Sequence, residues 1–235
     1  MKFYDIIINH NEMETKFMAT YICSDIHGEY NKYIEMLSKI EFNENDNLYI
    51  IGDVIDRKEG GLEIVDHIRQ YNNIHLIKGN HERRLVDFYK GMYDEFPIQK
   101  NPWFKADGLI TYNKLQEKDD KYIEELVEYL DKLPTVVNLG KYILVHGGFY
   151  NSDRDYTLEE ALNNTSEDKR LWNREFFLSD IKVKDYTVVL GHTPTYTLGH
   201  DKIMHKPGKI LIDCGCCYGK YLACLKLDEM KEFYI

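Results

Sequence analysis

The sequence predicts an α/β fold built as one large domain. Three short apolar runs each lead through a polar turn into a segment with helical spacing, which is the pattern of strand–turn–helix units. The 235 residues are 43% hydrophobic and 30% charged, so the chain can bury a core and is neither disordered nor fibrous. No Gly/Ser-rich linker, low-complexity tract or internal repeat divides the chain.

The three strand–turn–helix units occupy the first part of the chain. Each strand is predicted from a short apolar run that stops at polar or glycine residues. The predicted strands are residues 21–23, 48–51 and 74–77. After each strand, apolar residues recur three or four positions apart, as they do on one face of a helix. The segments with this helical spacing are residues 30–37, 62–68 and 85–88.

The middle of the chain, residues 92–133, departs from this pattern. It is heavily charged, and Tyr122, Leu126, Tyr129 and Leu130 give it a single apolar face, so we expect a helical insertion packed on the α/β body. Strands return after this insertion. They are predicted at residues 135–138, 142–145, 187–190, 210–212 and 221–227. Residues 1–17 carry no motif, and we expect them to form an N-terminal extension before a domain at residues 18–235.

Charge and cysteine usage exclude several classes of function. The 30 basic and 40 acidic residues give a net charge of −10, which disfavours nonspecific nucleic-acid binding. No apolar run approaches the roughly 18 residues of a membrane span, so we expect no membrane association. The five cysteines form no even-numbered framework, which favours reduced thiols and a cytoplasmic location. Cys214, Cys216 and Cys217 lack CxxC or matched histidine spacing, so we expect them to pack as small apolar residues.

Residues able to do chemistry follow the predicted strands at five separate turns. They are Asp25 and His27; Asp53, Asp56 and Arg57; Asn80 and His81; His146; and His192. Ligand sites of α/β sheets lie outside the carboxyl ends of strands, so we expect these side chains to meet at one rim. Mixed carboxylate, imidazole and amide ligands suit a pair of divalent cations such as Mn²⁺, Fe or Zn²⁺. Helix capping explains the Asp and Asn residues singly, but not the histidines at matching turns.

The motifs around these residues resemble those of the calcineurin-like metallophosphoesterases. The motifs are DIH at 25–27, GDVIDR at 52–57, GNHE at 79–82, HG at 146–147 and GH at 191–192. The GDxxDR and GNHE forms resemble the phosphoprotein phosphatase branch. LWNRE at 171–175 with GHTP at 191–194 resembles the lambda-type and bacterial serine/threonine phosphatases of that branch. The resemblance implies a two-sheet β-sandwich flanked by helices.

The resemblance also implies a role for each residue. Asp25 and His27 correspond to ligands of a first metal, and Asp53 to the carboxylate that bridges two metals. Ligands of the second metal are implied at Asn80, His146 and His192. His81 corresponds to the general acid, and Asp56 to the residue that orients its imidazole. Arg57 and Arg174 correspond to the pair that binds phosphate oxygens, which a planar guanidinium matches with two parallel hydrogen bonds.

We therefore expect a dimetal phosphoesterase, with Mn²⁺ as the most favoured metal, that acts on a phosphorylated protein or nucleotide. A serine/threonine protein phosphatase that hydrolyses phosphomonoesters is our first choice. The alternative is a symmetrical hydrolase of dinucleoside polyphosphates such as diadenosine tetraphosphate, because that group shares nearly all these motifs. A non-catalytic binding module on the same fold is a third reading, and the intact set of ligands argues against it.

Overall fold

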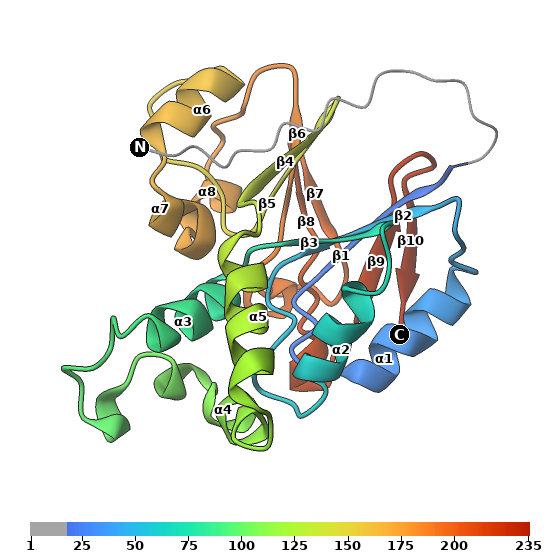
Figure 1. Cartoon of the computed structure of the whole chain (residues 1–235). Helices are drawn as coiled ribbons and strands as arrows, with labels where there is room; N and C mark the ends of the chain where they lie inside the picture. The colour runs from blue at the N-terminus through green and yellow to red at the C-terminus, as the bar shows by residue number, and fades with distance from the viewer. Residues whose placement is uncertain (1–17) are drawn as a thin grey trace.

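The computed structural model describes residues 18–235, which form two mixed β-sheets packed face to face with helices on both outer sides (Figure 1). The first sheet has the strand order β10-β9-β1-β2-β3. Its strands are β1 (Thr20–Ser24), β2 (Asn47–Ile51), β3 (Ile74–Ile77), β9 (Ala223–Lys226) and β10 (Lys231–Tyr234). The second sheet has the order β4-β5-β6-β8-β7. Its strands are β4 (Val136–Leu139), β5 (Tyr142–Val145), β6 (Thr187–Leu190), β7 (Met204–Lys206) and β8 (Lys209–Leu211).

Helices cover the outer face of each sheet. Those from the first half of the chain are α1 (Tyr30–Lys39), α2 (Gly61–Ile68), α3 (Asn80–Tyr89), α4 (Leu109–Leu115) and α5 (Asp120–Asp131). Those after β5 are α6 (Leu158–Asn164), α7 (Glu167–Trp172) and α8 (Glu175–Leu178). Four short 3₁₀ helices lie in the connections: η1 (Ile98–Lys100) and η2 (Phe104–Ala106) between α3 and α4, η3 (Thr195–Leu198) between β6 and β7, and η4 (Cys216–Tyr218) between β8 and β9. None of the helices in residues 18–235 is both long enough and apolar enough to cross a membrane.

The strand register sends alternate side chains to opposite faces of each sheet. In β1, Ile22 faces the second sheet, whereas Tyr21 and Cys23 belong to the core beneath the helices, as the period of two in a strand requires. Leu144 and Val189 meet Ile22 from the second sheet in the same buried cluster. The outer faces bury the apolar sides of α1, α2 and α5 on one sheet and of α6 and α8 on the other.

Parallel pairing decides where the strand ends lie. β1 pairs with β2 and β2 with β3 in parallel, and so do β5 with β6 and β6 with β8. The carboxyl ends of neighbouring parallel strands therefore fall together, which is where α/β proteins place ligands.

The predicted fold class is confirmed, and so are the three strand–turn–helix units and the helical character of residues 92–133, which contain α4 and α5. The prediction missed β7 and β10, and only part of residues 221–227 is strand. Both missed strands lie at sheet edges and carry lysines, as edge strands commonly do, so they show no apolar run. The predicted extension at residues 1–17 lies outside the described residues.

Candidate active site

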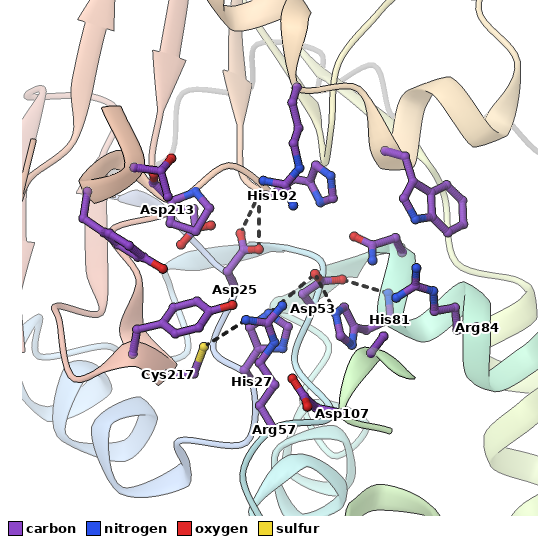
Figure 2. A pocket seen from close by; sticks show the side chains of 18 of the residues that line it. Asp25, His27, Asp53, Arg57, His81, Arg84, Asp107, His192, Asp213 and Cys217 are labelled. Atoms are coloured by element: carbon purple, nitrogen blue, oxygen red, sulfur yellow. Dashed lines mark hydrogen bonds and ion pairs between the residues drawn. The ribbon is translucent and has the colours of Figure 1, made fainter. Parts of the chain in front are cut away.

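The predicted site residues gather where strands of both sheets end. Asp25 follows β1, Asp53 follows β2, and Asn80 opens α3 after β3. His146 and His192 follow β5 and β6 of the second sheet. Eight of the ten predicted residues line one cavity of about 390 Å³ (Figure 2). These eight are Asp25, His27, Asp53, Arg57, Asn80, His81, Arg174 and His192. The other two, Asp56 and His146, are completely buried behind them.

The backbone of this rim is strained at many of the predicted residues. Non-glycine residues seldom adopt positive φ, and they concentrate at functional sites, because each such residue costs about 1–3 kcal/mol. Six of the predicted residues do so: Asp25 (φ 50°), His27 (48°), Asp53 (55°), Asp56 (68°), Arg57 (69°) and His192 (67°). Asp25, Asp53 and His192 have this conformation in the turns that follow β1, β2 and β6, and their side chains line the same cavity.

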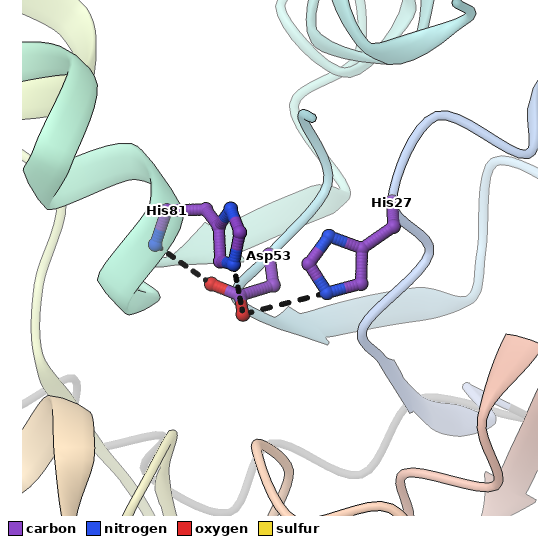
Figure 3. Close-up of side chains that lie close together, drawn as sticks. All are labelled: His27, Asp53 and His81. Carbon is purple, nitrogen blue, oxygen red and sulfur yellow. Dashed lines mark hydrogen bonds and ion pairs between the residues drawn. The ribbon is translucent and has the colours of Figure 1, made fainter. Parts of the chain in front are cut away.

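Asp53 lies at the centre of the cluster. Its Oδ2 is 3.3 Å from Nε2 of His146, 3.6 Å from Nε2 of His27 and 3.9 Å from Nε2 of His81. Figure 3 shows His27 and His81 on opposite sides of this carboxylate. Burial alone would raise the pKa of Asp53, but the surrounding imidazoles, above all that of His146, hold it well below its usual range.

The histidines are oriented as metal-binding histidines usually are. Nδ1 of His27 donates to the carbonyl of Ile55 (3.0 Å), and Nδ1 of His146 donates to the carbonyl of Ile51 (2.9 Å). These bonds leave Nε2 of both rings directed into the site, where Nε2 of His146 also lies 3.0 Å from Oδ1 of Asn80. A backbone carbonyl fixes the orientation of a metal-binding histidine in the same way. Both ring nitrogens of His192 are buried without a hydrogen-bond partner among the described residues.

The donor set fits two divalent cations. Two groups of side chains present ligand atoms within 4.8 Å of one another, and Asp53 belongs to both. They are His27, Asp53 and His81, and Asp53, His146 and His192. Asp25 is in neither group; it accepts hydrogen bonds from the backbone N–H of His192, the shorter at 3.0 Å. Burial raises the pKa of Asp25 to about 6, so a nearby cation would stabilise its ionised form.

His81 and Asp56 form a buried pair beside this cluster. Nδ1 of His81 lies 2.7 Å from Oδ2 of Asp56, which leaves Nε2 facing the cavity. Burial opposes protonation of His81, yet the carboxylates of Asp53 and Asp56 raise the pKa of its imidazole above the ordinary value. A histidine held in this way can carry a proton towards a group in the cavity.

Positive side chains surround the same cavity. Arg57 and Arg174, both predicted, come from distant turns and line it together with Arg84 and Lys105, which the sequence analysis missed. A signal for Arg84 existed, since it lies three residues after His81 in α3 and therefore on the same helix face. Asp213 was also missed, although it follows β8 closely at the same sheet edge as the other strand-end residues.

Aromatic rings lie next to two of these arginines. The guanidinium of Arg84 lies 5.9 Å from the ring of Trp172, and that of Arg57 lies 4.9 Å from the ring of Tyr218. Tyr196 packs edge-on against Tyr218 at 5.5 Å. In Figure 2, Arg84 lies on one side of Asp53, whereas Cys217, the neighbour of Tyr218, lies on the other. Two pairs of an arginine and an aromatic ring therefore line the same cavity.

Glu82, the last residue of the GNHE motif, holds two turns of the rim together. Its completely buried carboxylate accepts hydrogen bonds from the backbone N–H groups of Gly79 (2.9 Å), Asp53 (2.8 Å) and Val54 (2.9 Å). No role for Glu82 is predicted from the sequence. The structure shows that it joins the turn after β2 to the start of α3.

The cysteines near the site are free thiols. Burial raises the pKa of Cys214 to about 12 and that of Cys217 to about 11, so both remain protonated at neutral pH. The guanidinium of Arg57 lies 3.6 Å from the Cys217 sulfur. Cys214 and Cys216 are buried, in agreement with their expected packing role. Cys217 departs from that expectation, because it is only partly buried and lines the cavity.

The chain is similar to known proteins over most of its length. The family model described as calcineurin-like phosphoesterase matches residues 18–223. A symmetrical bis(5'-nucleosyl)-tetraphosphatase of Buchnera aphidicola subsp. Baizongia pistaciae is 25% identical over 92% of this chain and 97% of its own length. The protein of the same name from Erwinia tasmaniensis is 32% identical over 56% of this chain and 44% of its own length.

Solved structures show the same fold at low sequence identity. A crystal structure of a protein provisionally identified as a diadenosine tetraphosphatase superposes with a TM-score of 0.68 at 18% identity, covering 93% of both chains. A protein serine/threonine phosphatase from Saccharomyces cerevisiae has a TM-score of 0.58 at 13% identity, covering 93% of this chain and 79% of its own.

Proposed function

The chain belongs to the calcineurin-like phosphoesterase family and is a metal-dependent phosphoric ester hydrolase, and from this premise we propose that it cleaves dinucleoside polyphosphates symmetrically. The observation that carries the proposal is the likeness, over nearly the whole of both chains, to a symmetrical bis(5'-nucleosyl)-tetraphosphatase. This favours the alternative raised by the sequence over its first choice, a serine/threonine protein phosphatase. The enzymatic family also argues against a non-catalytic module.

The shape of the cavity supports a substrate larger than a single phosphate. Its volume of about 390 Å³ lies within the roughly 300–1,000 Å³ typical of small-molecule sites. Trp172 and Tyr218 line the cavity, each with an arginine guanidinium over its ring, and purine bases can stack on aromatic rings and on guanidinium planes. A dinucleoside polyphosphate has a base at each end and phosphates between, which matches this arrangement.

The charges of the cavity support the same class of substrate. Four cationic side chains, those of Arg57, Arg84, Lys105 and Arg174, face four carboxylates in its lining. When all are ionised these charges cancel, so two bound dications would leave a net charge of about +4. A tetraphosphate with one negative charge on each phosphate is the matching ligand.

The metals would be held by the residues at the strand ends. We assign Asp25, His27 and Asp53 to one ion, and Asp53, Asn80, His146 and His192 to the other, with Mn²⁺ favoured and Fe or Zn²⁺ as alternatives. When bound, such ions act as Lewis acids towards phosphoryl oxygens and make water a stronger nucleophile at neutral pH. The buried nitrogens of His192, which lack a hydrogen-bond partner among the described residues, and the buried carboxylate of Asp25, whose pKa is raised to about 6, are the observations that fit this assignment.

The remaining side chains act on the substrate directly. Arg57 and Arg174 bind the oxygens of the phosphoryl group under attack, where negative charge is spread in the transition state. His81 gives a proton from Nε2 to the leaving oxygen, and Asp56 holds its Nδ1–H. We also keep a cytoplasmic location as a proposal, because all five cysteines are free thiols.

A serine/threonine protein phosphatase remains the second candidate, because a yeast enzyme of that activity shares the fold and Arg174 is exposed to a large partner. A panel of substrates with Mn²⁺ separates the two. We expect kcat/KM for diadenosine tetraphosphate to exceed that for serine and threonine phosphopeptides and for nitrophenyl phosphate. Faster turnover of the phosphopeptides would overturn the proposal in favour of the second candidate.

A further inference from the structure

Two residues of the helical insertion, residues 92–133, contact the carboxylate of Asp56. Nε1 of Trp103 donates to Oδ2 at 3.0 Å, and the hydroxyl of Thr111 donates to Oδ1 at 2.6 Å. The same hydroxyl accepts the backbone N–H of Asp56 at 3.0 Å. Together with His81, these groups leave the carboxylate completely buried and fully oriented.

We propose that Trp103 and Thr111 are positioning residues for the proton donor, so that the insertion completes the active site instead of merely covering the domain. They fix the rotation of the Asp56 carboxylate, and this carboxylate fixes the ring of His81. The inference rests on the role of His81 in the proposed function. Neither Trp103 nor Thr111 is among the residues that line the cavity, so both act through Asp56.

The insertion is itself held firmly at this point. Trp103 is completely buried and packs against the rings of Phe88 (5.2 Å) and Phe104 (5.7 Å). Gly108 passes so close to the indole that a Cβ at this position would collide with it, so only glycine permits the approach. Oδ1 of Asn101 accepts the backbone N–H of Trp103 at 2.9 Å. The indole N–H therefore has little freedom to leave Asp56.

The insertion also supports the backbone of the phosphate-binding turn. Asp56 and Arg57 are consecutive residues with positive φ, a conformation that neighbouring structure must hold in place. Beyond the Thr111 contact, the N–H of Arg57 donates to the carbonyl of Asp107 at 3.4 Å. Asp107 follows η2 in the same insertion. The turn that carries both the proton-donor partner and a phosphate ligand is thus braced by residues 103–111.

The pair Thr111→Val and Thr111→Ser tests this inference with little change in volume. Valine removes the hydroxyl, whereas serine keeps it and should restore most of the activity. Tyr122→Phe is the matched control, because it removes another hydrogen bond of the insertion, from the Tyr122 hydroxyl to Asp66 at 3.0 Å, away from Asp56. Trp103→Phe, which removes the indole N–H, is measured together with these variants. The conclusion depends on the two Thr111 variants, because they are less prone to misfold.

The readout is the ratio of kcat for phenyl phosphate to kcat for nitrophenyl phosphate, measured with Mn²⁺. Phenol is a weak acid, with a pKa near that of tyrosine at about 10, so its departure depends on protonation far more than that of nitrophenol. We expect Thr111→Val to lower kcat for phenyl phosphate roughly 10- to 150-fold, the effect of losing a hydrogen bond to a charged group. The loss for nitrophenyl phosphate should be much smaller, with KM and metal content unchanged, and Tyr122→Phe should keep the wild-type ratio.

His81→Asn, measured on the same two esters, separates this inference from the function on which it rests. If His81→Asn loses more on phenyl phosphate but Thr111→Val loses equally on both esters, the proton-donor role stands and the positioning role is overturned. A change of ratio in Tyr122→Phe as large as in Thr111→Val would also overturn it. If His81→Asn itself loses equally on both esters, the proton-donor role falls, and the inference falls with it.

Discussion

Replacing Arg57 with alanine should weaken phosphate binding more than replacing Arg174. Arg57 is placed before substrate arrives, since its guanidinium lies 3.6 Å from the Cys217 sulfur and 4.9 Å from the Tyr218 ring. Its Nε is buried and has no hydrogen-bond partner within residues 18–235. Arg174 is exposed, so it must lose side-chain freedom when it binds phosphate.

The expected losses of kcat/KM differ because Arg57 is already held in place and Arg174 is exposed. A hydrogen bond to a charged group contributes about 1.5–3 kcal/mol, so Arg57→Ala should lower kcat/KM roughly 10- to 150-fold. Ordering an exposed arginine costs about 1.5–2 kcal/mol, which offsets much of what its hydrogen bonds contribute. Arg174→Ala should therefore lower kcat/KM by roughly 10-fold or less. Lysine at either position should restore only part of the loss, because it keeps the charge without the planar fork.

The assay is kcat/KM on diadenosine tetraphosphate with Mn²⁺, together with the inhibition constant of free phosphate. In each variant, kcat/KM should fall and the inhibition constant of phosphate should rise by a similar factor. The metal content should stay at the wild-type value. Arg154→Ala is the control, since that exposed arginine pairs with Glu160 at 2.7 Å outside the cavity lining. The reasoning is refuted if Arg57→Ala binds phosphate and turns over substrate as well as wild type, or if Arg174→Ala is the more damaged of the two.

Three further substitutions test other parts of the site. Asp53→Asn should abolish activity and lower the metal content measured by elemental analysis, because both proposed ions share this carboxylate; two retained metals and near-normal turnover would contradict the bridging role. His81→Asn should lower kcat by roughly 10²–10⁴, less for nitrophenyl than for alkyl phosphate, and equal losses on both esters would speak against a proton donor. Glu82→Ala leaves three buried N–H groups unpaired, so the free energy of unfolding in urea should fall by roughly 3 kcal/mol or more; a change below about 0.5 kcal/mol would show that water replaces the carboxylate.

Most of the site could be predicted from the sequence, because the positions of its residues depend on local structure. Asp25, Asp53, Asn80, His146 and His192 each follow a strand within a few residues. The parallel order of the strands then brings these distant positions together. A pattern of strand, turn and polar residue is therefore enough to predict that the side chains meet, without knowledge of how the two sheets pack.

The parts that escaped prediction depend on tertiary packing. Trp103 and Thr111 reach Asp56 only because the insertion folds back over α3, and no periodicity in residues 92–133 encodes that contact. Arg84 and Asp213 could have been predicted from the sequence. Arg84 has helical spacing from His81, and Asp213 follows the end of a strand. Trp172 and Tyr218 could not be predicted as site residues, because each contacts an arginine that comes from another part of the chain.

The most direct test of the proposed function is the identity of the nucleotides released from diadenosine tetraphosphate. The protein is loaded with Mn²⁺, and the products are separated by anion-exchange chromatography at early times, with a sample treated with a chelator beside it. We predict ADP as the sole nucleotide product, formed only in the metal-loaded sample. Release of ATP and AMP in equal amounts, or an intact tetraphosphate under conditions in which phosphopeptides lose phosphate, would contradict symmetrical cleavage by this site.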